Sequence, residues 1–290
     1  MKNVLSIELG KAVKNRWFAI SISFGVLCAV MSLVAVLKEY YSDTGVMGIM
    51  QALERDQLAS LEDFTQITTL YNSWIGSAGM TLGHSLFYTL LPLLAVLPCG
   101  WCFSEELNSG YLHTAIPLCG RKRYFTVKMA AYFLSGGLIA FLPQLLSLLL
   151  TALFIPAILP NILYHIYYPI EHGAMLSGLF YSHPMMYIAI VLGMDFVFGG
   201  LYAWLSMTVA LLTRNRMSTI IIPFLLLLAG DMARNLILYI SFLEISPLMI
   251  LHPLSPSNIV KGWIVLAWMG VLLVVSVPIL LYKGGRYEIS

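Results

Sequence analysis

The chain has 290 residues, of which 59% are hydrophobic and only 10% charged, and its formal net charge is +2. Soluble globular proteins carry about 25% charged residues, so this composition excludes an ordinary water-exposed surface. Lipid-facing positions need apolar side chains. The sequence therefore predicts an all-α polytopic membrane protein, in which residues 1–290 form a single transmembrane domain.

Six segments are candidates for membrane-spanning helices. A helix needs about 20 apolar residues to cross the hydrocarbon core, and backbone groups in lipid must be hydrogen bonded within the helix itself. The six segments are Trp17–Leu37, Leu82–Phe103, Val127–Leu159, Tyr187–Thr213, Met217–Phe242 and Trp263–Tyr282. Pro143 and Pro156 in the third segment predict a kink or an early end of that helix.

The positive charges collect on one side of this predicted topology. Under the positive-inside rule, that side faces the cytoplasm. Its residues are Lys2, Lys11, Lys14, Arg16, Arg121, Lys122, Arg123, Lys128, Arg214, Arg216, Lys283 and Arg286, whereas the other side has only Lys38, Arg55, Arg234 and Lys261. We therefore expect a multi-pass protein of the cell membrane with both termini in the cytoplasm.

Three pieces are not expected to span the membrane. Residues 1–16 set apolar against basic positions, which predicts an amphipathic helix in the inner interface. Residues 38–81 form an outer loop, with apolar residues at a spacing typical of helices resting on the outer surface. Residues 244–262 are apolar but broken by three prolines, which favours an outer re-entrant hairpin before the last span.

The motif search excludes several kinds of chemistry. The chain has no G-x-x-x-x-G-K-[ST] loop, so it cannot itself be a P-loop ATPase. It also has no H-E-x-x-H zinc motif and no G-x-S-x-G elbow. We therefore expect neither a catalytic residue nor a bound cofactor in this chain, and no nucleic-acid partner.

Two groups of metal-ligating residue types are weaker candidates. Cys99 and Cys102 form a C-x-x-C pair, but they end an apolar helix rather than a strand–turn–helix unit, and a zinc site with His113 and Cys119 fits no finger or ribbon spacing. In the loop between the third and fourth spans, the neighbouring tyrosines favour an interfacial belt over a metal site made by His165, Glu171, His172 and His183. No metal is therefore predicted.

Three ionisable residues, Asp195, Asp231 and Arg234, fall inside the fourth and fifth spans. Isolated charges are expensive in lipid, so these side chains are expected to face the bundle and to pair. Asp231 and Arg234 are three residues apart and share a helical face. Two roles remain open: a buried ion pair that fixes helix packing, or residues that line a transport route or gate its outer end.

The segment from residue 104 to 128 carries the most information about function. Two glutamates stand where the second span leaves the membrane, and a basic cluster stands where the third span begins. The pattern resembles the inner loop of type-2 ABC exporter permeases, in which an acidic residue is followed by glycine, proline, a basic residue and lysine. The matching residues are Glu105 or Glu106, Gly110, Pro117, Arg121 or Arg123, and Lys128.

This resemblance implies a concrete assembly. Two permease chains, identical or closely related, would pair in the membrane lipid, with two copies of a separate ABC ATPase subunit beneath them. ATP and Mg²⁺ would bind to the ATPase, and residues 104–128 would form the coupling loop that docks on it. Small permeases of this shape are similar to the membrane subunits of phenol-soluble-modulin exporters, which implies an amphipathic or hydrophobic cargo such as a peptide, toxin or drug.

Two other function classes remain as alternatives. The first is an ion- or proton-coupled secondary transporter that uses Asp195 and Asp231 as carriers, although such folds usually contain internal repeats and none is convincing here. The second is an intramembrane enzyme. It would need catalytic residues gathered at one depth, for which only Asp195, Asp231 and Arg234 are candidates.

Overall fold

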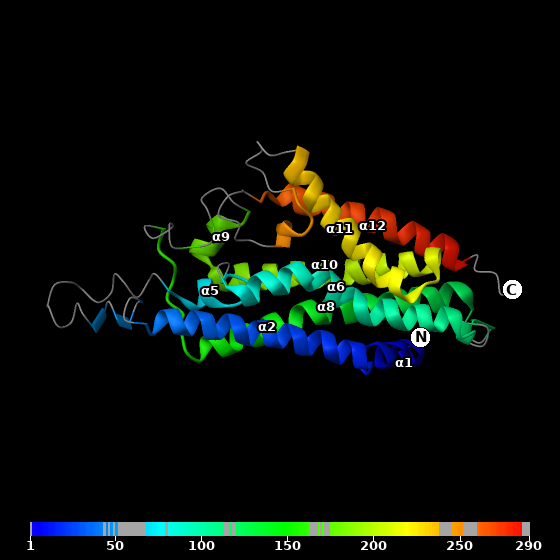
Figure 1. The fold of residues 1–290 in the computed structure, drawn as a ribbon, viewed down its shortest axis with the longest axis horizontal. Helices are drawn as coiled ribbons and strands as arrows, with labels where there is room; N and C mark the ends of the chain where they lie inside the picture. Colours follow the sequence, from blue (N-terminus) through cyan, green and yellow to red (C-terminus); the bar gives the residue numbers. More distant parts are fainter. Residues whose placement is uncertain are drawn as a thin grey trace.

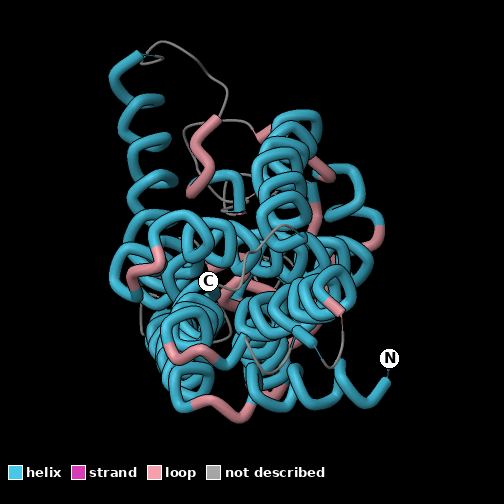
Figure 2. The backbone as a smooth tube through the Cα atoms, turned by 90° about the vertical axis from the view of Figure 1, so that its right-hand side faces the viewer, coloured by secondary structure: helices cyan, strands magenta, loops and turns pink. Residues whose placement is uncertain are grey.

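The computed structural model describes residues 2–42, 45, 47–48, 50–51, 68–78, 81–112, 116–117, 120–162, 168, 170, 175–237, 245–251 and 260–285. Within these ranges the regular structure is entirely helical, as the view along the bundle shows (Figure 2). The predicted all-α fold is therefore confirmed for this part of the chain.

Five of the described helices are long and apolar enough to cross a membrane. They run beside one another along the long axis of the molecule (Figure 1). Their bounds are α2 Arg16–Tyr40, α6 Leu82–Asn108, α8 Arg121–Ala152, α10 Pro184–Thr213 and α12 Gly262–Gly285. They coincide with the first four and the last of the six predicted spans.

The fifth predicted span corresponds to α11, Arg216–Ile237. This helix is inclined to the others in Figure 1, and the predicted continuation to Phe242 lies outside the described residues. Six spans therefore stay a prediction. The shorter helices are α1 Lys2–Val13, α5 Leu70–Ser73, α9 Ser177–Ser182 and the 3₁₀ turn η2 Met249–Leu251.

The bundle has two distinct ends. The α1 end holds the N-terminal helix, the turn between α6 and α8, and the C-terminal end of α12; the α9 end holds α5 and α9 (Figure 1). The first described helix and the C-terminal end of the last one thus lie toward the same end of the bundle (Figure 1), in keeping with termini on one side of a membrane. That this side is the cytoplasm stays a prediction.

The third predicted span ends early, as its prolines suggested. Helix α8 stops at Ala152, before Pro156, and residues 156–161 have no regular structure. Pro143 does not end the helix but lies inside it. A Cβ atom on Gly25 of α2 would lie 2.6 Å from Pro143 Cγ, so Gly25 provides the space that the proline ring occupies.

Part of the predicted outer loop lies in the core rather than on the surface. Trp74 and Ile75, directly after α5, are fully buried. The Ile75 N–H donates to Ser147 Oγ of α8 at 3.0 Å, and its carbonyl oxygen lies 2.5 Å from His84 Nδ1 of α6. These bonds satisfy buried backbone groups and anchor the turn after α5. Residues 52–67 of the loop are outside the described part.

The most extensive helix contact, between α8 and α10, depends on two glycines. A Cβ atom on Gly136 would lie 2.5 Å from the Gly199 carbonyl oxygen, and a Cβ atom on Gly199 would lie 2.6 Å from the Gly136 carbonyl oxygen. Such contacts against backbone atoms leave no room for any side chain. Membrane helices use small residues in this way to bring their backbones close together.

Replacing Gly136 by alanine is therefore expected to push α8 and α10 apart. Overpacking of this kind costs about 1–3 kcal/mol, so the thermal unfolding midpoint of the purified protein in detergent should fall. Gly193→Ala is the matched control, since Gly193 is also on α10 but a Cβ atom there would meet no neighbouring side chain or helix within 4 Å. Equal midpoints for Gly136→Ala and Gly193→Ala would contradict the close contact.

Candidate functional site

The residues predicted to couple to an ATPase lie at the α1 end, in the turn between α6 and α8 and in the adjoining ends of these two helices. Helix α6 continues beyond the apolar span to Asn108. Gly110 and Gly120 then have φ values of +73° and +78°, a backbone conformation that favours glycine. These two glycines let the chain leave α6 and enter α8, which places the ends of both helices next to α1.

Lys128 of α8 is buried at this end between two carboxylates. Its Nζ atom lies 2.5 Å from Glu8 Oε2 of α1 and forms a short ion pair with Glu106 Oε2 of α6. Only 1% of the Lys128 side chain and 3% of the Glu8 side chain are exposed. A buried charge must be paired and hydrogen bonded to be tolerated, and each of the three helices supplies one member of this group.

Two tyrosines and a second lysine complete the arrangement, which we call the Lys128 cluster (Glu8, Lys11, Glu106, Tyr111, Tyr124 and Lys128). The Tyr124 hydroxyl donates to Glu106 Oε2 at 3.2 Å, and Lys11 Nζ lies 3.3 Å from Glu8 Oε1. Lys11 also donates to Tyr111 Oη at 2.7 Å. Burial lowers the pKa of Lys11, but this hydrogen bond and the two glutamates outweigh burial and leave the pKa above its usual value.

The structure divides the predicted coupling residues into two groups. Glu106 and Lys128 lie inside the Lys128 cluster, so they can affect a partner only by positioning the turn. Glu105 is half-exposed, 3.7 Å from Arg216 Nη2, an exposed pair of the kind that contributes little stability. The other predicted residues with exposed side chains, which a partner could reach, are Pro117, Arg121 and Arg123; Lys122 between the two arginines is exposed too.

Helix α1 forms where the sequence predicts the interfacial helix, but its buried contacts are not those of a simple apolar face. Glu8 and Ala12 are buried, and α1 packs mainly on α8. The sequence pattern did not single out Glu8. The sequence did contain one indication that Glu8 has a buried partner, because Glu8 is the only acidic residue of α1. Whether α1 also lies in a membrane interface stays a prediction.

Asp195 is buried in the middle of the bundle. Its Oδ2 atom accepts hydrogen bonds from the Tyr88 hydroxyl of α6 at 3.0 Å and from Gln144 Nε2 of α8 at 2.6 Å. The prediction that Asp195 faces the bundle is therefore confirmed. Its partners are neutral donors, and within the described ranges it makes no salt bridge. Neither Tyr88 nor Gln144 had been recognised, because neutral polar residues carry no distinctive signal in an apolar span.

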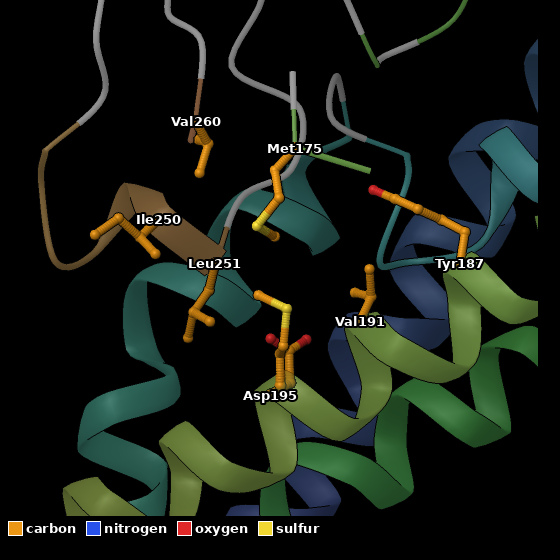
Figure 3. A pocket seen from close by; sticks show the side chains of 8 residues that line it. Met175, Tyr187, Val191, Asp195, Ile250, Leu251 and Val260 are labelled. Atoms are coloured by element: carbon orange, nitrogen blue, oxygen red, sulfur yellow. The ribbon is translucent and has the colours of Figure 1, made fainter. Parts of the chain in front are cut away.

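A small pocket opens beside Asp195 (Figure 3). Its walls come from α10, from Met175 just before α9, and from the 3₁₀ turn η2. Met175, Met194, Ile250 and Leu251 contribute apolar side chains. The pocket therefore combines one carboxylate with apolar walls, and its volume of about 20 Å³ is that of a site for about one water molecule.

The segment at residues 245–251 closes this region. The Trp268 Nε1 group of α12 donates to the Ile245 carbonyl oxygen at 2.9 Å, and the Tyr202 hydroxyl of α10 donates to the Pro247 carbonyl oxygen at 3.4 Å. Tyr202 lies 18 residues into α10, or about 27 Å along it. Residues 245–251 are thus inserted between helices, while residues 252–259 of the predicted hairpin lie outside the described part.

Asp231 of α11 is half-buried, and it accepts a hydrogen bond from Ser246 Oγ at 2.5 Å. The predicted pairing with Arg234 cannot be placed, since the Arg234 side chain lies outside the described atoms. The hydrogen bond links α11 to the segment 245–251. Asp195 and Asp231 thus have different hydrogen-bond partners.

The cysteine and histidine candidates do not form a metal site within the described ranges. Cys99 and Cys102 both lie within α6; Cys99 Sγ is 3.1 Å from Ser135 Oγ, and Cys102 Sγ accepts from Asn15 Nδ2 at 3.0 Å. No group of three metal-ligating side chains is found in this part of the chain. The other candidates, His113, Cys119, His165, Glu171 and His172, fall in the ranges that are not described.

Comparisons with protein families, with curated proteins and with solved structures find no match for this chain. The functional interpretation therefore rests on the two places where, among the described residues, charged side chains are buried: the Lys128 cluster and the Asp195 pocket.

Removing the lysine from the cluster should be strongly destabilising. Lys128→Met removes the buried cation between the carboxylates of Glu8 and Glu106 and leaves them only the partly exposed Lys11. Breaking a buried pair in this way costs about 3–5 kcal/mol. Thermal unfolding in detergent checks this, with the exposed neighbour Lys122→Met as the control. If both variants unfold at the wild-type midpoint, the cluster does not hold α1 in place.

Proposed function

We propose that this chain is the membrane-spanning subunit of an ATP-driven exporter and that a separate P-loop ATPase docks at the α1 end of the bundle. The observation that carries the proposal is the Lys128 cluster, which joins the N-terminal helix to both helices flanking the exposed basic turn. A displacement of the turn would therefore move α1, α6 and α8 together. The order of acidic, glycine, proline and basic residues in this turn supports the same interpretation.

Energy would come from the partner. The chain contains no phosphate-binding loop, so ATP and Mg²⁺ would bind to two ATPase subunits. A second permease chain, identical or closely related, would complete the transport route. The exposed arginines Arg121 and Arg123 would meet an acidic surface of the ATPase, since complementary charge steers association and fixes its register.

The helices provide a path from the docking end to Asp195. Helix α6 is continuous from the turn to Tyr88, and α8 is continuous from the turn to Gln144. Both side chains donate to Asp195 on α10. A displacement of α6 or α8 relative to α10 would therefore break or remake the hydrogen bonds of a buried carboxylate. Closure of the ATPase subunits would in this way change the hydrogen bonds of Asp195 and thereby the surroundings of a cargo.

A second candidate function is an ion- or proton-coupled secondary transporter, and the observation that favours it is the buried carboxylate of Asp195. Ionisable residues within membrane spans often belong to ion or proton pathways. An intramembrane enzyme is less well supported, because Asp195 and Asp231 are held by different partners.

Reversing the charge of the exposed turn should weaken ATPase docking. In the double variant Arg121→Glu/Arg123→Glu, like charges would meet at the interface, and we expect copurification of the ATPase to fall by at least about tenfold. Both side chains are exposed, so the chain should still insert and fold.

Lys261→Glu is the matched control, because Lys261 is an exposed lysine next to Val260, whose carbonyl oxygen accepts a hydrogen bond from the Met175 N–H just before α9. The measurement is the ATPase content and ATP hydrolysis rate of the complex purified from membranes. Undiminished ATPase binding by the double variant would refute the proposed docking surface.

A further inference from the structure

Two tryptophans and two arginines meet near the α1 end, outside the Lys128 cluster. The centroids of the Trp17 ring of α2 and the Trp101 ring of α6 are 4.7 Å apart. The Arg16 guanidinium lies 5.4 Å from the Trp17 ring centroid, and the Arg216 guanidinium of α11 lies 5.7 Å from the Trp101 ring centroid. These distances are typical of cation–π contacts. We call this group the double-tryptophan site (Arg16, Trp17, Trp101 and Arg216); it joins α2, α6 and α11.

Both arginines of the site can contact an anion. Arg16 is exposed and forms no ion pair with a described residue. The Arg216 side chain is 42% exposed, and its Nη2 atom lies 3.7 Å from Glu105 Oε1, which is longer than a normal hydrogen bond. A guanidinium over a ring face is held by its charge, so its N–H groups can still donate. Phosphate is the anion that such planar donors fit best.

The charges next to the site also favour an anion. Lys14 and Arg214 stand two residues before Arg16 and Arg216, and both are exposed. Among the described residues, the carboxylate that contacts the site is that of Glu105. Basic residues that cluster at the end of a membrane span attract anionic lipids.

Apolar side chains adjoin the arginines and tryptophans on the side of the spans. Ile20, one helical turn after Arg16, is 51% exposed, and Leu97, one turn before Trp101, is half-buried. Residues four apart share a helical face. Tryptophan rings in membrane proteins lie at the level of the lipid head groups. An acidic soluble protein would leave this apolar surface uncovered, whereas a phospholipid supplies a phosphate for the arginines and hydrocarbon for Ile20 and Leu97.

We propose that the double-tryptophan site binds the head group of an anionic phospholipid. Arg16 and Arg216 donate to its phosphate oxygens, the two indole rings lie at the level of the head group, and an acyl chain runs past Ile20 and Leu97. The bound lipid holds α2, α6 and α11 together from outside the bundle. The proposal requires that the bundle lies in a membrane, but it does not rest on the exporter function, because no ATPase takes part.

The test compares how two brominated lipids, phosphatidylglycerol and phosphatidylcholine, quench the tryptophan fluorescence of the purified chain in nanodiscs. Bromine quenches an indole only at short range, so the quenching reports which lipid lies next to the tryptophans. Both lipids carry a phosphate, but phosphatidylglycerol is anionic and phosphatidylcholine is neutral overall. At equal mole fractions we expect more quenching by phosphatidylglycerol, and this excess should saturate as its mole fraction rises.

Removing the two guanidiniums should abolish the excess quenching. Arg16→Gln/Arg216→Gln changes side chains that are exposed or partly exposed, so the chain should still fold. Lys122→Gln/Lys283→Gln is the matched control, because it loses the same net charge from exposed positions in the first turn of α8 and the last turn of α12. This control should keep the excess.

A third variant locates the lipid. Trp17→Phe/Trp101→Phe removes the two indoles that should report the contact, so phosphatidylglycerol and phosphatidylcholine should then quench the remaining tryptophans equally. Equal quenching by the two lipids in the folded wild type would overturn the proposal. So would an excess that persists in the arginine or the tryptophan variant, or an excess that the lysine control also loses, since the attraction would then be diffuse.

Discussion

Lys128 places one positive charge between two carboxylates that come from different helices, and the arrangement of the α1 end depends on this contact. A buried ion pair adds little net stability compared with apolar packing, but removing one partner is severely destabilising. Its effect is therefore to specify geometry. Helix α1 cannot leave α6 and α8 without exposing unpaired buried charges, so the N-terminal helix and the basic turn behave as one unit.

The same two helices that meet at Lys128 also hold Asp195. Tyr88 and Gln144 bring α6 and α8 to a single oxygen atom on α10, and the Gly136–Gly199 contact brings the backbones of α8 and α10 close together. The α1 end and the buried carboxylate are thus linked by continuous helices. This connection makes a conformational exporter mechanism physically reasonable for the chain.

The sequence predicted those features that the membrane requires of a single stretch of chain, namely the apolar length of a span and the scarcity of charges within it. Apolar length located α2, α6, α8, α10 and α12, and the cost of charge in lipid singled out Asp195 before its partners were known. The sequence did not predict contacts between residues that are far apart along the chain. Glu8 and Lys128 are separated by 120 residues, and Gln144 is a neutral side chain that carries no periodic signal. The glycines at Gly136 and Gly199 were a readable hint of close helix packing that the apolar pattern obscured.

The central claim, that a separate ATPase drives this chain from the α1 end, is tested most directly by lysine cross-linking and mass spectrometry of the protein isolated from its native membranes. Four exposed lysines mark the two ends. Lys14 follows α1 and Lys122 is in the first turn of α8, whereas Lys38 is in the last turn of α2 and Lys261 follows Val260, which is hydrogen bonded to Met175 just before α9. We predict cross-links from Lys14 or Lys122 to a protein that contains a P-loop, and none from Lys38 or Lys261. A chain that moves solute while cross-linked to no such protein would contradict the claim.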